Sequence, residues 1–163
     1  MKNLSICLLI LLLFVLGCGT FVKNFKRSSS NFDPYSGSLS ELLQSEFSSL
    51  RVKFKSEGTR DTTADYKGEA KESKAFTYIQ EAAGVGVQVD GVLVNFNSAA
   101  IAKEQLQKVA GEVKGAIANK DKGLRFTAEN GKIVGWTNGS LMCLVKSSAG
   151  TKPAANFEEA VPF

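Results

Sequence analysis

The chain has 163 residues, enough for one domain with tails, and its net charge of +4 is too small and too scattered to indicate nucleic-acid binding. It contains no histidine, which excludes His-based catalytic triads, histidine general bases and histidine-ligated metal sites. Cys143 lies in an apolar run, where a thiol is usually buried and inert. We therefore expect no cofactor and no metal.

Residues 1–18 predict export. Lys2 gives the segment a positive start, and the apolar run from 4 to 16 is interrupted only by Ser5. This run is short for a transmembrane helix, lies at the N-terminus and is followed by a small residue. These features are typical of a signal peptide.

The segment ends in two aliphatic residues, a small residue and a cysteine: Val15, Leu16, Gly17 and Cys18. This pattern resembles the lipobox of bacterial lipoproteins. The resemblance implies that residues 1–17 are a signal peptide, that cleavage precedes Cys18 and that Cys18 is acylated, for example with palmitate. It also implies a lipid-anchored location in the cell envelope, in the outer membrane if the host is Gram-negative. An ordinary secretory signal and a single membrane anchor are the alternatives.

Residues 18–37 are rich in Ser, Asn and Gly, which predicts a flexible, lipid-anchored tether. Lys23, Lys26 and Arg27 follow the lipobox closely, and we expect them to attract anionic lipid headgroups. A solvated linker with incidental charge is the alternative. After cleavage and acylation Cys143 would be the one free cysteine, so we expect no intramolecular disulfide.

Residues 38–147 predict a small domain that begins with a short helix. Ser38 and Glu41 have the spacing of a capping box, and an apolar stripe follows over 39–50. Alternation of apolar and basic residues over 50–55 then predicts a half-buried strand with a basic outer face.

The next stretch is less regular. Residues 57–73 are polar and charged, which predicts a loop. Residues 75–80 fit a strand or a helix, and we favour the strand. Residues 85–96 predict a β-hairpin, because alternating apolar residues flank Asp90-Gly91, a favoured two-residue turn.

The second half of the domain predicts one long helix and a meander. Ser98 is the expected N-cap of a helix that extends to Ala118, with Gly111 and Gly115 indicating close packing onto the sheet. The segment 124–146 predicts three strands joined by two Asn-Gly turns. These turns would place Glu129 opposite Lys132 and Trp136 opposite Leu141. The continuous apolar run 141–145 predicts a central strand, buried on both faces.

The expected fold class is therefore α+β, with a single antiparallel sheet built from a hairpin and a meander and one long helix on one face. A short N-terminal helix, a flexible tether and a C-terminal tail over 148–163 complete it. The tail is expected either to be disordered or to place Phe157 and Phe163 on the body of the domain.

The expected function is a non-catalytic module that binds a protein partner or an envelope component near the membrane. Trp136, beside a predicted turn, is a possible partner contact, although such a residue more often covers its own sheet. A carrier of an apolar ligand is an alternative, and a cell-envelope enzyme that uses a carboxylate pair is another. We expect no enzyme, because the sequence has no histidine and no dense acidic or cysteine cluster.

Overall fold

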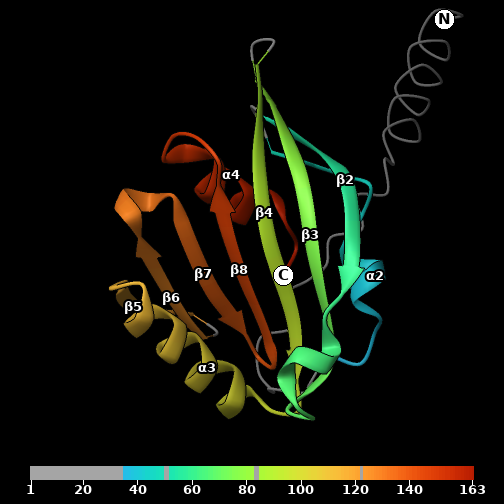
Figure 1. The fold of residues 1–163 in the computed structure, drawn as a ribbon, viewed down its shortest axis with the longest axis vertical. Helices are drawn as coiled ribbons and strands as arrows, with labels where there is room; N and C mark the ends of the chain where they lie inside the picture. The colour runs from blue at the N-terminus through green and yellow to red at the C-terminus, as the bar shows by residue number, and fades with distance from the viewer. Residues whose placement is uncertain (1–34, 50–51, 83–84, 122) are drawn as a thin grey trace, which may run out of the picture.

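The structure is a computed structural model that describes residues 35–49, 52–82, 85–121 and 123–163. The described residues form one antiparallel eight-stranded sheet with three α-helices, which confirms an α+β fold with a single sheet (Figure 1). The helices are α2 (Leu39–Leu42), α3 (Ala99–Glu112) and α4 (Lys152–Ala160). The strands are β1 (Glu46–Ser48), β2 (Lys53–Asp61), β3 (Ala70–Ala82), β4 (Val85–Phe96), β5 (Ala116–Lys120), β6 (Gly123–Ala128), β7 (Ile133–Asn138) and β8 (Leu141–Ser147).

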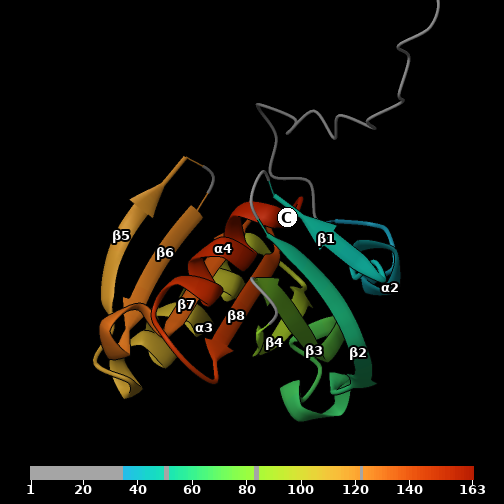
Figure 2. The same ribbon diagram turned by 90° about the horizontal axis from the view of Figure 1, so that it is seen from above.

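The sheet consists of two meanders joined along β4 and β8. The strand order is β1-β2-β3-β4-β8-β7-β6-β5, so β1 and β5 form the two edges, as Figure 2 shows from above. β3 and β4 are the longest strands, and their shared hairpin extends beyond the other strands in Figure 1. β8 pairs with β4 and β7 and is largely buried, as its apolar run predicted.

Two hydrophobic cores lie on opposite faces of this sheet, because neighbouring residues of a strand point to opposite sides. The core under α2 and α4 is rich in aromatic rings: Phe47, Phe54, Phe76, Tyr78, Trp136, Phe157 and Phe163. The core under α3 contains mainly smaller side chains: Ala70, Val94, Ala102, Leu106, Ala110, Ala128, Ile133 and Met142, together with Phe96 and Phe126.

The predicted hairpin at Asp90-Gly91 is wrong, because β4 runs without a turn from Val85 to Phe96. β4 is paired along its length with β3 and with β8 beyond its middle, which holds it extended. Gly91 is required because its neighbours pack too closely for a side chain, and not because the chain turns there. A Cβ at this position would overlap the Phe76 ring and lie 2.7 Å from the carbonyl oxygen of Leu144.

The long helix is shorter than predicted. Ser98 caps α3 as expected, since its Oγ accepts a hydrogen bond from the backbone N–H of Ile101 at 3.3 Å. The helix ends at Glu112, and Lys114 adopts a left-handed backbone with φ of 52°. Ile117, which continues the apolar helical spacing in the sequence, lies instead in β5, and β5 pairs with β6.

The two glycines near the end of α3 have different surroundings. A Cβ on Gly111 would meet nothing within 4 Å, so the expected close packing at this position is wrong. A Cβ on Gly115 would lie 2.6 Å from Cδ2 of Phe126, so this glycine is needed where the chain passes from α3 into β5.

The predicted loop over 57–73 is also wrong in part. β2 continues to Asp61, a 3-10 turn spans Thr63–Tyr66, and β3 begins at Ala70. The favoured strand over 75–80 is confirmed as the middle of β3. The polar residues misled the prediction because residues 57–61 of β2 are exposed on both faces and the start of β3 is exposed in part.

The meander is present, but its turns are displaced. Asn138 pairs with Leu141, which places Cys143 opposite Trp136 and corrects the predicted register. At the other turn Ala128 pairs with Ile133, and a 3-10 turn occupies the loop between them. Glu129 therefore forms its ion pair with Lys146 at 3.3 Å, and not with Lys132 as predicted.

The predicted C-terminal tail contains a helix. Pro153 lies in the first turn of α4, where its missing N–H has no intrahelical partner to lose. Ala154, Phe157 and Val161 are buried at helical spacing against the aromatic core. The alternative in which Phe157 and Phe163 pack on the domain is confirmed, since both are at most 5 % exposed.

Candidate functional site

One part of the α3 face of the sheet lacks a covering helix. α3 packs on β6, β7, β8 and part of β4, whereas β2 and β3 lie to its side in Figure 1. The exposed or half-buried residues that point outward here from β3 and β4 are Ala75, Thr77, Ile79, Gln88, Asp90 and Val92, which we call the open patch. The residues between them on the same strands are buried in the aromatic core. The open patch is therefore a part of the α3 face of β3 and β4 that no helix covers.

The open patch contains a carboxylate with a fixed orientation. Asp90 Oδ1 accepts a hydrogen bond from the hydroxyl of Thr77 at 2.7 Å, across the β3–β4 pairing. The Gln88 amide nitrogen donates to both carboxylate oxygens of Asp90 at 2.9 Å. Ile79 and Val92 lie beside this polar group, half-buried. The patch thus combines two apolar side chains with an acceptor between them that is exposed to solvent and held in place.

The basic outer face predicted for β2 is present but electrically balanced. Lys53 and Lys55 are exposed on the side opposite the buried Phe54. Across the neighbouring strands, Glu81 is the partner of Lys53, and Glu46 is the partner of Lys55. Acidic residues directly opposite the lysines reduce the local field, so this surface is a poor site for an anionic ligand.

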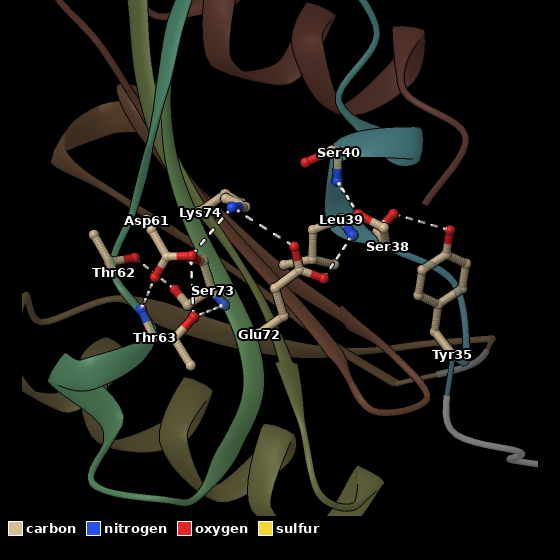
Figure 3. A network of polar contacts seen from close by, with 10 residues as sticks. All are labelled: Tyr35, Ser38, Leu39, Ser40, Asp61, Thr62, Thr63, Glu72, Ser73 and Lys74. Atoms are coloured by element: carbon tan, nitrogen blue, oxygen red, sulfur yellow. Dashed lines mark hydrogen bonds and ion pairs between the residues drawn. The ribbon is translucent and has the colours of Figure 1, made fainter.

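A polar network joins α2, β2 and β3, as Figure 3 shows. Glu72 Oε2 accepts a hydrogen bond from the backbone N–H of Leu39 at 2.9 Å, at the start of α2. Lys74 Nζ lies 3.1 Å from Asp61 Oδ2 and 3.8 Å from Glu72 Oε1. The backbone N–H of Thr63, followed by Lys74, holds the pKa of Asp61 below its usual range. These carboxylates are engaged in fixing the ends of elements.

The same network contains a buried hydroxyl pair. Thr62 Oγ1 and Ser73 Oγ are 2.7 Å apart, and the Ser73 backbone N–H donates to Thr63 Oγ1 at 2.9 Å (Figure 3). A nucleophilic serine needs a neighbouring general base. The described groups bonded to Ser73 are hydroxyls and backbone, so this pair fits a role in holding the 3-10 turn against β3.

A second ionic cluster holds α4 on the sheet. Glu158 Oε1 lies 2.8 Å from Lys120 Nζ, and its Oε2 lies 2.8 Å from Arg125 Nε. The Glu158 side chain is only 10 % exposed, so the pair is screened less than a surface ion pair. Lys120 also lies 5.7 Å from the ring centroid of Trp136, within the range of a cation–π interaction.

The chain preceding α2 is attached to the sheet at a defined place. The Asn95 amide nitrogen donates to the backbone oxygen of Tyr35 at 2.7 Å, and the Tyr35 N–H donates to Ser140 Oγ at 3.2 Å. The Ser140 hydroxyl donates in turn to Asn95 Oδ1 at 2.9 Å. Asn95 and Ser140 are buried, so this network fixes where the N-terminal part of the chain meets the domain.

The site residues predicted from sequence fall into two groups. Cys18, Lys23, Lys26 and Arg27 lie outside the described residues. Trp136 is 1 % exposed and donates its indole N–H to the backbone oxygen of Phe163 at 2.8 Å, so as placed here it is a core residue with no surface for a partner. It covers its own sheet, beside Cys143 rather than Leu141.

Cys143 is buried, and burial raises the pKa of its thiol well above the usual value. The thiol form therefore dominates at neutral pH, which agrees with the inert role predicted for it. Within the described ranges no group of three or more Cys, Asp or Glu side chains is placed to hold a metal ion. No helix in the part of the chain that the structure describes is long and apolar enough to cross a membrane.

Sequence reasoning missed the open patch. It assigned Asp90 to a turn, and it left Thr77 and Gln88 without a role. The sequence over 75–80 alternates the aromatic residues Phe76 and Tyr78 with Ala75, Thr77 and Ile79, which indicates a strand but not which of its faces is uncovered. Comparisons with protein-family models, curated proteins and solved structures found no match for this chain.

Proposed function

We propose that this chain is a lipid-anchored, extracytoplasmic bacterial lipoprotein and a non-catalytic module that binds a protein partner near the membrane. The observation that carries the proposal is the open patch, in which the Thr77–Asp90 pair lies at the centre and the half-buried Ile79 and Val92 lie on either side of it. Protein interfaces likewise combine apolar contacts with direct polar contacts. On this side α3 covers β6, β7, β8 and part of β4, and the open patch lies on the part of β3 and β4 that it leaves uncovered, where we expect a partner to dock.

The chemistry of the open patch indicates what the partner presents. Ile79 and Val92 require an apolar surface, and the fixed Asp90 carboxylate favours a basic side chain beside it. Thr77 and Gln88 already orient this carboxylate, so little conformational entropy is lost when a partner cation meets it. The preferred partner is a protein with an apolar centre and a nearby lysine or arginine.

Packing on the α3 side weighs against a carrier of an apolar ligand. A Cβ on Gly135 would overlap the Phe126 ring and lie 3.0 Å from Cδ1 of Leu106. At this point α3 and the sheet are therefore in direct contact, without room for a ligand between them. The engagement of Glu72 and Glu158 in structural contacts likewise weighs against an enzyme that uses a carboxylate pair.

The anchor is supported by the lipobox resemblance at Cys18. Metabolic labelling with a clickable fatty acid tests it. The wild type and Cys7→Ala should be labelled, since Cys7 lies inside the proposed signal peptide, and Cys18→Ala should not be labelled. Equal labelling of Cys18→Ala and the wild type would reject the anchor, and with it the envelope location, including the outer membrane of a Gram-negative host.

The basic residues of the proposed tether are a separate part of the proposal. Replacement of Lys23, Lys26 and Arg27 by Ser should weaken binding of the acylated chain to anionic vesicles and leave binding to neutral vesicles unchanged. Added salt should have the same effect, because exposed charges are screened. Unchanged binding in both experiments would show that the acyl chains alone anchor the protein.

The partner site is tested by photo-crosslinking in intact cells. A photoreactive amino acid at Gln88 lies in the open patch, and the same amino acid at Gln107 lies on an exposed part of α3 outside it. We expect a discrete adduct from position 88 alone, which mass spectrometry then identifies. Introduction of Ile79→Lys should abolish this adduct. Adducts of the same kind from both positions, or none from position 88, would reject the open patch as the partner site.

A further inference from the structure

The two edges of the sheet differ in how they are protected. Strand edges present unpaired backbone N–H and C=O groups, and natural proteins usually protect them with charges, prolines, bulges or short strands. β1, at one edge, has three residues and begins with the exposed Glu46. β5, at the other edge in Figure 2, has five residues and no proline, and its first four are uncharged. β5 therefore lacks the usual protection.

The exposure of β5 extends to its side chains. Ala116, Ile117, Ala118 and Asn119 are all exposed, which includes both faces of the strand. Ile117 is 45 % exposed and is one of two large hydrophobic side chains exposed to this degree among the described residues. The single charge of the strand, on Lys120, is directed to Glu158 at 2.8 Å and is thus neutralised within the chain. Nothing on this edge repels another strand.

We propose that β5 pairs with β5 of a second copy of this chain, in antiparallel orientation, to join two sheets into one. A two-fold axis at Ala118 places Ala118 opposite its own copy, Ile117 opposite Asn119, and Ala116 opposite Lys120. In this register no like charges face each other. The two Ile117 side chains become diagonal neighbours on the α3 face, about 7–8 Å apart between their Cα atoms, and cover each other.

The second copy is the occupant that the chemistry of β5 favours. The strand is self-complementary in charge and size, with alanine at its centre, so the backbones meet without a bulky obstacle. Pairing of five residues buries less than the roughly 800 Å² per partner of a standard stable interface, so the dimer is weak and exchanges rapidly. This interaction leaves the open patch free, because the patch lies on β3 and β4.

Site-directed disulfide formation tests this pairing in the purified full chain in detergent. Ala118→Cys places two thiols directly opposite each other, whereas Ala116→Cys is matched in exposure and face but puts them about 14 Å apart by strand geometry. Because a disulfide requires Cα atoms within about 7 Å, we expect a dimer yield about tenfold higher for Ala118→Cys. The wild-type chain gives the background from its own cysteines.

A second pair of variants separates pairing from random collision. In the Ala118→Cys chain, Ile117→Lys should abolish the excess dimer, because two lysines then become neighbours. Val85→Lys, at a position 65 % exposed outside β5, should leave the excess unchanged. Equal yields from Ala116→Cys and Ala118→Cys, a yield at background level from Ala118→Cys, or insensitivity to Ile117→Lys would each overturn the proposal. In intact cells, adducts of Ala118→Cys with a different protein in place of the dimer would overturn the choice of a second copy.

Discussion

The two faces of the sheet differ in the side chains that form their cores and in how much of each face is covered. On the α4 face, aromatic rings from strands and helix meet around Phe157, whose ring centroid lies 5.2–5.3 Å from those of Phe54, Phe76 and Tyr78. On the α3 face, smaller side chains pack under a single helix that covers only part of the surface. We expect the aromatic face to contribute most to stability, and the partly open face carries the patch where we propose that a partner binds.

The strongest test of this contrast is a comparison of two truncations in the cores. Phe157→Ala removes a buried ring with several ring contacts, and we expect a loss of about 5 kcal/mol in the free energy of unfolding. Leu106→Ala, in the core under α3, should cost about 3 kcal/mol. Urea denaturation measures both. A larger loss for Leu106→Ala would contradict the dominant role of the α4 face.

Two glycines of β4 sharpen the contrast, because one lies on each face. Gly91→Ala would force a methyl group into Phe76 and the Leu144 carbonyl, and we expect a loss of about 2 kcal/mol. Gly86→Ala would meet only Cγ2 of Ile79 at 3.0 Å, a half-buried side chain in the open patch that needs to shift by a few tenths of an ångström, so its effect should be smaller, about 0.5 kcal/mol. Equal losses in thermal denaturation would show that both faces are equally tight.

Tyr78, in the aromatic core, should make the stability of the fold depend on pH. Its hydroxyl donates to the backbone oxygen of Gln44, and burial raises its pKa to about 12. Since the unfolded chain releases this proton first, near pH 10, stability is complete below that pH and falls as pH rises towards 12. Tyr78→Phe should cost about 1 kcal/mol at pH 7 and remove this part of the alkaline loss. An unchanged pH profile of unfolding in Tyr78→Phe would show that this burial has no energetic consequence.

A substitution near the end of α3 is expected to stabilise the fold slightly. Gly111→Ala adds a methyl group where nothing lies within 4 Å, so we expect a gain of up to about 1 kcal/mol from helix propensity. Gly115→Ala is the matched control and should destabilise the fold, because its Cβ would meet Phe126. Thermal melting distinguishes the two. A loss from both substitutions would mean that the surroundings of Gly111 are as constrained as those of Gly115.

Much of the local structure could be predicted from periodicity and caps. Ser38 and Ser98 cap α2 and α3 as expected, and the apolar run in β8 predicted a buried central strand. The α+β class with one antiparallel sheet followed from these patterns. Such signals are local, so they can be recognised without knowledge of the tertiary partners.

The errors arose where distant residues decide the outcome. Asp90-Gly91 fits a turn locally, but pairing with β3 and β8 keeps it extended, and Gly91 is required by Phe76 and Leu144. Ile117 continues the spacing of α3, but the helix ends at Glu112, and Ile117 pairs with β6 as part of an edge strand. The open patch could not be predicted, because its existence depends on where α3 ends on the sheet.

Solvent protection in the native envelope tests the central proposal most directly. A thiol introduced by Gln88→Cys lies in the open patch, and one introduced by Gln107→Cys lies on the exposed side of α3. We expect a membrane-impermeant maleimide to label position 88 several-fold more slowly in envelopes than in purified protein, and to label position 107 at similar rates in both. If the ratio of the labelling rates at positions 88 and 107 is the same in envelopes as in purified protein, position 88 is not covered in the envelope. That result would contradict a partner on the open patch.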